Sequence, residues 1–469
     1  MIALTDQDLL FPPEANSRSL ARALYAGVKD LPIVSPHGHT DPRWYALNEP
    51  FPDPAQLLIV PDHYIFRMLF SQGVRLEELG VPALDGAPVE TDGRAIWRRF
   101  AEHYYLFRGT PTRLWLDHVL EHLFGIEAPL DASTADRHYD AIAAQLSQDD
   151  YRPRALFERF NIEVIATTEG ALDDLKWHRM IRDSGWKGRV VTAYRPDAVV
   201  DPDFEGFAAN LDRLGEITGC HTGNWAGYLE AHRQRRAYFR EFGATSTDHG
   251  HPTAETANLS GAAAEELFNR IRRGSEDERE RRLFRAQMLT EMAKMSLDDG
   301  LVLQIHPGSW RNHSPSIFQR FGRYKGFDIP TKTDYVTALK PLLDAVGLER
   351  DLTIILFTLD ETSYARELAP LAGVYPALKL GPAWWFHDSP EGMRRFREMT
   401  TETAGFYNTV GFNDDTRAFP SIPARHDVAR RVDCAFLARL VAEHRLREEE
   451  AHELAAELAY TLAKKAYRL

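Results

Sequence analysis

The chain has 469 residues, 44% of them hydrophobic and 27% charged, which is the composition of a globular protein with ample core material. Its net charge of −13 argues against nucleic acid or a membrane surface as a partner, because both favour basic faces. No apolar run approaches the roughly eighteen residues of a membrane span, and the first residues lack the pattern of a secretory signal. The only cysteines, Cys220 and Cys434, stand far apart in the sequence, so we expect a cytoplasmic protein.

Short apolar runs recur along the chain, and most are followed by a segment with helical spacing. We expect strands at residues 33–37, 163–168, 189–194, 244–248, 301–306, 353–358, 377–381 and 409–413. Several of these runs are apolar throughout, as in parallel strands that are buried on both faces. Helical patterns lie between them, for instance at 173–183, 204–218, 262–297 and 334–346. Eight alternating units predict an α/β fold, a (β/α)₈ barrel of the TIM type, with an open doubly wound sheet as the alternative.

Two segments fall outside this alternation. Residues 66–154 contain AIWRRFAEHYYLF and TRLWLDHVLEHLFGI, both with helical spacing, and predict a mainly helical insertion that leans over the barrel mouth. In the tail, 427–469, Leu454, Leu458 and Leu462 recur at four-residue steps, which predicts amphipathic closing helices. We expect residues 1–469 to form one domain that carries this insertion.

Polar side chains follow several predicted strands, where a barrel of this kind carries its working groups. Those after the first, third, fourth, fifth and eighth strands are His37 and His39, Arg195, Asp248 and His249, His306 and Arg311, and Asp415 and Arg417. His37 and His39 alternate with Gly38, so both imidazoles project to the same side and can hold a divalent ion such as zinc. An acidic residue after the last strand can complete a three-ligand site, because the first and last strands of a closed barrel are neighbours.

Two other histidine patterns compete with this one. His249 and His251 are again one residue apart, but a polar run precedes them and a proline follows, which favours a loop. His118, Glu121 and His122 match the spacing of an inverted zinc-peptidase motif. The many apolar neighbours of that segment favour a helix packed in the core instead.

Several motifs resemble one family. They are SPHGHTDP, PDHYIFRMLFSQGV, TTEGALDDLKWH, YRPD, TDHG, QIHPGSWRN, GPAWWFHDSPEGM and DDTRAFPSIPARHDVARR. Their order and spacing resemble the uronate isomerases (glucuronate isomerase) of the amidohydrolase superfamily over nearly the whole chain. The resemblance implies a distorted barrel with one divalent metal ion, usually zinc. It also implies aldose–ketose isomerisation of D-glucuronate to D-fructuronate and of D-galacturonate to D-tagaturonate.

The resemblance also implies residue roles. His37, His39 and Asp415 resemble the metal ligands; His63 and Tyr64 resemble a pair that contacts the substrate; and Arg195, Arg311 and Arg417 resemble arginines around the bound uronate. His306 and Asp248 fall at active-site positions, and Trp384, with Trp385, matches the pocket wall. We expect Asp415, or alternatively His306, to take the C2 proton and Tyr64 to help deliver a proton to C1. At least one arginine should pair with the C6 carboxylate.

Three departures shape these expectations. Glu169 and Gly170 stand where relatives usually carry an aspartate pair, which puts the role of that loop in question. Compared with hydrolytic amidohydrolases, the sixth strand ends without a histidine and the fourth ends without a lysine that could be carbamylated. We therefore expect no two-metal centre. The competing functions are a metal-dependent hydrolase or lactonase of a sugar acid, and a sugar-acid binding protein without catalysis. The sequence is compatible with both a monomer and a homo-oligomer.

Overall fold

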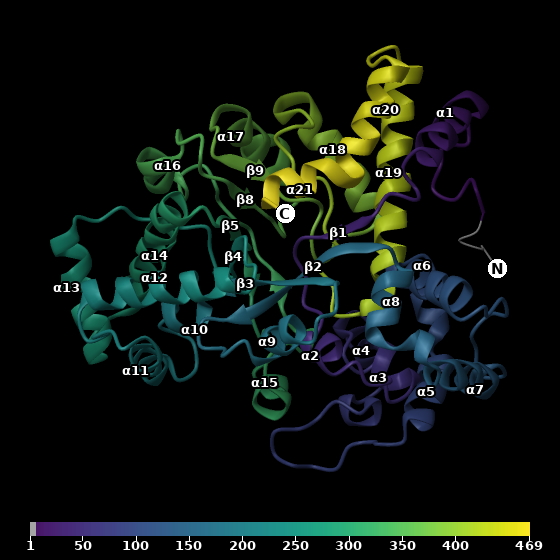
Figure 1. Cartoon of the computed structure of the whole chain (residues 1–469), viewed down its shortest axis with the longest axis horizontal. Coiled ribbons are helices and arrows are strands. Elements are labelled where there is room, and N and C mark those ends of the chain that lie inside the picture. The colour runs from purple at the N-terminus through teal and green to yellow at the C-terminus, as the bar shows by residue number, and fades with distance from the viewer. Residues whose placement is uncertain (1–5) are drawn as a thin grey trace.

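The computed structural model describes residues 6–469, and a parallel sheet of seven strands runs through its centre (Figure 1). The strands, in their spatial order, are β1 (Ile33–Ser35), β2 (Ile162–Gly170), β3 (Arg189–Arg195), β4 (Ser246–His249), β5 (Val302–Ile305), β8 (Ile354–Leu356) and β9 (Leu378–Leu380). Each strand of this sheet lies beside the one that follows it along the chain, which is the order of successive β/α units. The sheet curls into a distorted barrel of the TIM type, so the predicted fold class is confirmed.

The predicted eighth strand, at 409–413, differs from the other seven. Thr409 forms a single parallel bridge with Leu380, and within residues 6–469 no ladder joins this segment to β1. Gly411 has a φ of +74°, a left-handed conformation that interrupts an extended run. The barrel is instead closed here by loops, through a hydrogen bond of 3.0 Å from the backbone N–H of His39 to the carbonyl of Thr416.

Helices surround the sheet. They are α1 (Ala15–Ala26), α2 (Pro42–Leu47), α3 (Pro54–Leu58), α4 (His63–Ser71), α5 (Gly93–Glu102), α6 (Pro111–His118), α7 (Ala135–Leu146), α8 (Pro153–Arg159), α9 (Lys176–Asp183), α10 (Asp197–Val200), α11 (Phe207–Thr218), α12 (Trp225–Glu241), α13 (Gly261–Arg273), α14 (Glu278–Asp299), α15 (Pro315–Phe321), α16 (Lys340–Val346), α17 (Ala369–Val374), α18 (Pro390–Ala404), α19 (Ile422–Ala442), α20 (Glu448–Ala456) and α21 (Leu462–Tyr467). A short antiparallel pair, β6 (Ser309–Trp310) and β7 (Ile329–Pro330), lies between β5 and β8.

The helical pattern predicted at 262–297 is two helices, α13 and α14. Gly274, with a φ of +63°, caps the end of α13. Asp277 caps the start of α14, where its side chain and that of Glu280 form a capping box. These two caps separate the helices within residues 272–282, a charged stretch without apolar side chains.

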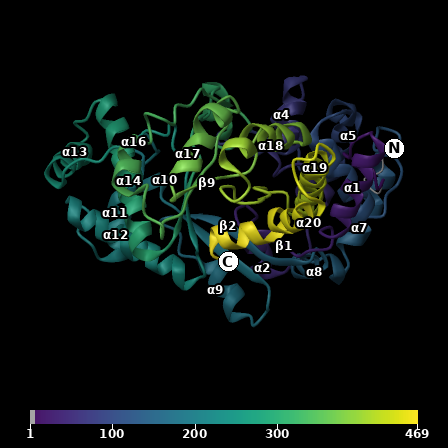
Figure 2. The same ribbon diagram turned by 90° about the horizontal axis from the view of Figure 1, so that it is seen from above.

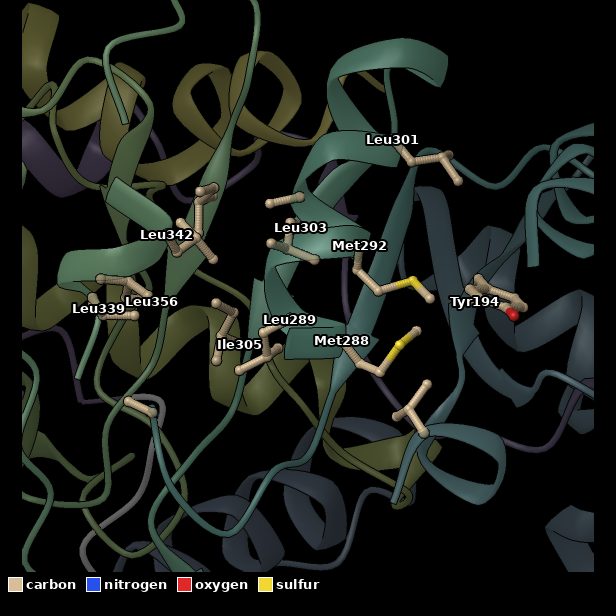
Figure 3. Packing of buried hydrophobic residues seen from close by; sticks show 14 of the residues in the cluster. Tyr194, Met288, Leu289, Met292, Leu301, Leu303, Ile305, Leu339, Leu342 and Leu356 are labelled. Carbon is tan, nitrogen blue, oxygen red and sulfur yellow. The ribbon is translucent and has the colours of Figure 1, made fainter. Parts of the chain in front are cut away.

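The largest hydrophobic core lies between the sheet and the helices outside it. Leu303 and Ile305 of β5 belong to this cluster together with Met288, Leu289 and Met292 of α14 (Figure 3). All five side chains are fully buried. This packing fixes the direction of β5, which ends directly before His306.

Residues 54–159, between β1 and β2, contain helices α3–α8 and no strand. Figure 2 shows α5, α7 and α8 gathered at one end of the molecule, away from α11–α14. Their apolar side chains form a second core, in which Trp97 and Phe100 cluster with Ile162 and Ile165 of β2. This core brings α4 to the same edge of the barrel as the strand ends.

The C-terminal helices close the barrel from within. Ala463 of α21 clusters with Val34, Val164 and Val191 of the first three strands. The hydroxyl of Tyr467 donates to Oε1 of Gln304 at 3.0 Å and anchors the end of the chain against β5. This bears out the predicted closing helices. In the part of the chain that the structure describes, no helix is both long and apolar enough to cross a membrane.

Candidate active site

One pocket opens at the carboxyl ends of the strands. Every residue predicted for the site lines this pocket: His37, His39, His63, Tyr64, Arg195, Asp248, His306, Arg311, Trp384, Asp415 and Arg417. They come from the loop after β1, from α4, β3 and β4, and from the loops after β5, β9 and Thr409. The fold therefore brings together groups that are as far apart in sequence as His37 and Asp415.

The two histidines after β1 meet the carboxylate of Asp415. Oδ1 of Asp415 lies 3.4 Å from Nε2 of His37 and 3.2 Å from Nε2 of His39. The indole of Trp384 donates to Oδ2 of Asp415 at 2.5 Å, whereas Oδ1 is buried without a hydrogen-bond partner. Asp415 has a φ of +38°, a strained backbone conformation for a residue with a side chain. Three donor atoms that converge on one point, one of them unsatisfied, fit a divalent metal ion.

The protonation states also suit metal binding. Burial lowers the pKa of His39 to about 4, although Asp415 opposes this shift, so the imidazole is neutral at pH 7. Burial alone would raise the pKa of Asp415, but His37 and His39 outweigh it and lower the pKa well below its usual range. A neutral imidazole and an ionised carboxylate are the forms that bind a metal ion.

A second polar group adjoins the first and shares His37 with it. Nδ1 of His306 lies 2.7 Å from Oδ1 of Asp248, and the rings of His306 and His37 stack with their centres 4.6 Å apart. Nε2 of His306 is buried and has no hydrogen-bond partner. Burial is the main cause that lowers the pKa of His306, so its ring is neutral and can accept a proton at pH 7.

The three arginines of the pocket differ in their partners. Arg195 pairs with Asp197 at 2.8 Å and with Asp248 at 2.9 Å. Arg311 pairs with Asp328 at 3.0 Å.

Arg417 forms no salt bridge with any carboxylate of residues 6–469. Its guanidinium instead lies 4.9 Å from the ring centre of Tyr324. Burial lowers the pKa of Arg417, and Arg195 and Arg311 add to this effect. An arginine that is partly buried and lacks a carboxylate partner is suited to bind an anion from outside the chain.

The helical segment between β1 and β2 supplies two site residues from the start of α4. The His63 ring stacks on Trp385 with the ring planes 8° apart, and burial lowers the pKa of His63 to about 3. The hydroxyl of Tyr64 donates to Oδ1 of Asp388 at 2.9 Å. Asp62 caps this helix by accepting from the backbone N–H of Tyr64 at 2.8 Å.

The pocket also contains residues that were not predicted from the sequence, among them Asp328, Tyr324, Asp388 and Arg425. Asp388 and Arg425 lie within the motifs AWWFHDSPEGM and RAFPSIPARHD. The motifs therefore pointed to both residues, although no role was inferred for either one. Tyr324 and Asp328 belong to the connection between β5 and β8 and lie outside every motif of the family resemblance.

The loop with Glu169 and Gly170, which departs from the pattern of the family, does not line the pocket. The carboxylate of Glu169 accepts hydrogen bonds from Thr167, at 2.9 Å, and from Thr192, and it lies 3.7 Å from Nε2 of His178. Burial raises the pKa of Glu169 to about 8, despite both hydroxyl donors.

The competing histidine patterns lie outside the pocket as well. His118 ends α6, His122 follows in a π-helical turn, and none of His118, His122, His249 and His251 lines the pocket. Within the described residues, every group of three or more potential ligands is drawn from the pocket residues already named.

A barrel of this type with a cluster of potential metal ligands at its carboxyl edge defines the class of the protein, an α/β-barrel enzyme. Comparison with known proteins narrows this class. The family model described as glucuronate isomerase matches residues 8–467. The chain is 90% identical over 469 residues to a uronate isomerase of Mesorhizobium japonicum, with both chains covered completely.

Solved structures agree with the sequence relatives. The crystal structure of glucuronate isomerase from Caulobacter crescentus is 63% identical, with a TM-score of 0.97 over 98% of this chain and 96% of that one. Uronate isomerase from Thermotoga maritima is 26% identical, with a TM-score of 0.91 over 99% of each chain. The chain therefore belongs to the glucuronate isomerase family. The predicted family and the predicted class of enzyme, a uronate isomerase, are confirmed.

Proposed function

We propose that this chain interconverts D-glucuronate with D-fructuronate, and D-galacturonate with D-tagaturonate, by moving a proton between C2 and C1. One observation carries the proposal: Arg417, which lacks a carboxylate partner among the described residues, lines the same pocket as the cluster of His37, His39 and Asp415. A uronate has a carboxylate at one end and a carbonyl at the other. The pocket offers a free cation for the first and a metal-binding cluster for the second.

We propose that His37, His39 and Asp415 hold one divalent metal ion, and that this ion is zinc. Two imidazoles and a carboxylate form a set of ligands that zinc accepts, and Oδ1 of Asp415 has no other partner. When bound, such an ion supplies positive charge that polarises the oxygens at C1 and C2 of the sugar. The hydrogen bond from Trp384 would hold the second oxygen of Asp415 in place.

For the proton transfer we propose Asp415 as the base that takes the proton from C2. Its lowered pKa makes it a weak base, which is why His306 is kept as the second candidate. His306 is neutral, and its Nε2 has no partner. The side chain that takes the proton from C2 must give one up again in each turnover, because the isomerisation neither consumes nor releases protons.

We propose that Tyr64 takes part in proton delivery to C1. Burial and the nearby Asp388 raise the pKa of its phenol, so the hydroxyl stays protonated at pH 7. Arg195 and Arg311 would line the sugar, while Arg417 would bind the C6 carboxylate with its planar fork. His63, Asp248 and Trp384 would contact the substrate from the walls of the pocket.

Incubation of the purified protein with D-glucuronate and with D-galacturonate tests this function. We expect proton NMR to show the corresponding ketoses, and elemental analysis to show about one zinc per chain. Hydrolysis of a sugar-acid lactone without ketose formation would favour the hydrolase alternative. Binding of either uronate without any conversion would favour a binding protein.

Three further expectations are proposals about the whole chain. We propose a cytoplasmic location, which the unpaired thiols of Cys220 and Cys434 support. We propose that the chain is one domain with residues 66–154 as an insertion, because their core includes side chains of β1 and β2. Size-exclusion chromatography with light scattering would decide between a monomer and a homo-oligomer.

A further inference from the structure

We propose that Asp388 is a positioning residue that fixes the direction of the Tyr64 hydroxyl proton. The proposal rests on the proposed role of Tyr64 in proton transfer. Asp388 lies in the loop between β9 and α18, whereas Tyr64 begins α4 more than three hundred residues earlier. Their contact therefore joins the helical segment after β1 to the loop after β9, the last strand of the curled sheet.

The phenolic oxygen of Tyr64 has two protein partners. Its O–H donates to Oδ1 of Asp388 at 2.9 Å, and it accepts from the backbone N–H of Phe386 at 3.2 Å. Phe386 has a φ of +70°, a conformation that is costly for a bulky side chain. The chain holds this strained conformation at the residue whose N–H meets Tyr64.

Asp388 is held in turn by a buried cation. Nη1 of Arg425 donates to Oδ2 of Asp388 at 2.9 Å, so each carboxylate oxygen receives one donor. The Arg425 side chain is only 3% exposed, and its guanidinium lies 3.5 Å from the ring centre of Trp115 in α6. Its Nε also donates to the hydroxyl of Ser421 at 3.2 Å. Arg425 therefore has little freedom to move. Because it donates to Asp388, it also restricts the position of the Asp388 carboxylate.

The Tyr64 hydroxyl has a limited number of hydrogen-bonding positions. Its oxygen carries one proton and two acceptor lone pairs. With the proton given to Asp388 and one lone pair given to Phe386, one acceptor position remains for a substrate hydroxyl. Tyr64 lines the pocket, so it meets the sugar as a hydrogen-bond acceptor with a single orientation. Isomerisation requires a sugar hydroxyl to lose its proton, and Tyr64, fixed as an acceptor, would orient that hydroxyl. This orientation is the part that Tyr64 takes in proton delivery to C1, because its own proton is held by Asp388.

An amide at position 388 would reverse this arrangement with almost no change in volume. Asparagine has one oxygen where aspartate has two, and Arg425 can only donate, so the cation would take that oxygen. The amide NH₂ would then face Tyr64 and donate to it. The Tyr64 proton would lose its acceptor and turn elsewhere, while Arg425 would keep a partner.

The competing explanation is that Asp388 and Arg425 only tie the helical segment to the barrel. A double-mutant cycle separates the two explanations, because a residue that acts through the Tyr64 hydroxyl has nothing left to act on in Tyr64→Phe. Asp433 supplies a matched control. It forms a buried pair with Arg397, with distances of 2.6 and 2.9 Å, between α18 and α19 and outside the pocket.

The experiment measures kcat and KM for D-glucuronate, together with the melting temperature, in five proteins. These are the unaltered chain, Asp388→Asn, Tyr64→Phe, the double variant and Asp433→Asn. We expect Asp388→Asn to lower kcat by roughly 100-fold, the scale of a displaced acid or base, and to leave KM within about threefold. We expect the double variant to match Tyr64→Phe within about twofold. Asp433→Asn should lower the melting temperature but keep kcat within about twofold.

Two results would overturn the proposal: losses in kcat that multiply in the double variant, or a loss in Asp433→Asn as large as that in Asp388→Asn. If Asp388→Asn does not fold, Asp388→Glu keeps the charge beside Arg425 while it displaces the acceptor of Tyr64. Its loss in kcat should likewise vanish in the Tyr64→Phe background, and a loss that persists there would refute the proposal. An unaltered chain that produces no ketose would refute the proposed function instead, so the two failures are distinct.

Discussion

Replacement of Arg417 by methionine should weaken uronate binding without destabilising the fold. Arg417 makes no salt bridge within residues 6–469, so its removal strands no acidic side chain. A charge-assisted contact contributes about 3 kcal/mol at the upper end, which corresponds to roughly 100-fold in affinity. We therefore expect KM for D-glucuronate to rise by about this factor, with the melting temperature within about 2 °C of that of the unaltered chain.

The same change at Arg195 provides the contrast. Arg195 pairs with Asp248, whose side chain is 1% exposed, and with Asp197. Removal of one partner from a buried pair costs about 3–5 kcal/mol, because the remaining charge is left without compensation. Arg195→Met should therefore lose stability as well as activity, whereas Arg417→Met should lose only affinity.

Inhibitors test the assignment of the carboxylate directly. A six-carbon aldonate and the matching alditol differ in one terminal carboxylate, and both can be measured as competitive inhibitors. Arg417→Met should raise the inhibition constant of the acid by roughly 100-fold and leave that of the alditol within about twofold. Equal losses for both inhibitors, or an unchanged KM for the uronate, would refute the assignment of Arg417 to the carboxylate.

Three further changes test other parts of the site and fold. Asp415→Asn should lower kcat by several powers of ten with an unchanged circular dichroism spectrum, and near-normal turnover would remove Asp415 from the mechanism. His39→Ala should lower the zinc content of the purified protein well below that of the unaltered chain, as measured by mass spectrometry; an equal content would exclude His39 as a ligand. Burial raises the pKa of Glu169 to about 8 from 4.5, so its contribution to stability is complete below about pH 4.5 and is lost as the pH rises through 8. Glu169→Gln should therefore melt at a temperature that falls less between pH 5 and 9 than that of the unaltered chain, and parallel melting curves would contradict the raised pKa.

Much of the fold could be predicted from local patterns. The apolar runs before His37 and within residues 301–306 are typical of strands buried on both faces, and the structure has strands there. The boundary between α13 and α14 also has a signal in the sequence, since Gly274 and Asp277 cap the two helices, but residues 262–297 were interpreted as one helical pattern. The helix α12 has few apolar residues in a clear stripe, and it was not predicted.

By itself the sequence determined the alternation of strands and helices, the histidine pair after the first strand and the family to which the chain belongs. The tertiary structure decided which groups are free to act. Arg195, Arg311 and Arg417 all follow predicted strands, and their carboxylate partners distinguish them. Asp197 is two residues from Arg195, but Asp248 and Asp328 reach Arg195 and Arg311 from 53 and 17 residues away, and Arg417 has no such partner within residues 6–469. The physical reason is that charge pairing depends on distance in space, which local propensity and spacing do not encode. The direction of the Tyr64 hydroxyl follows the same rule, because Asp388 defines it from the opposite end of the chain.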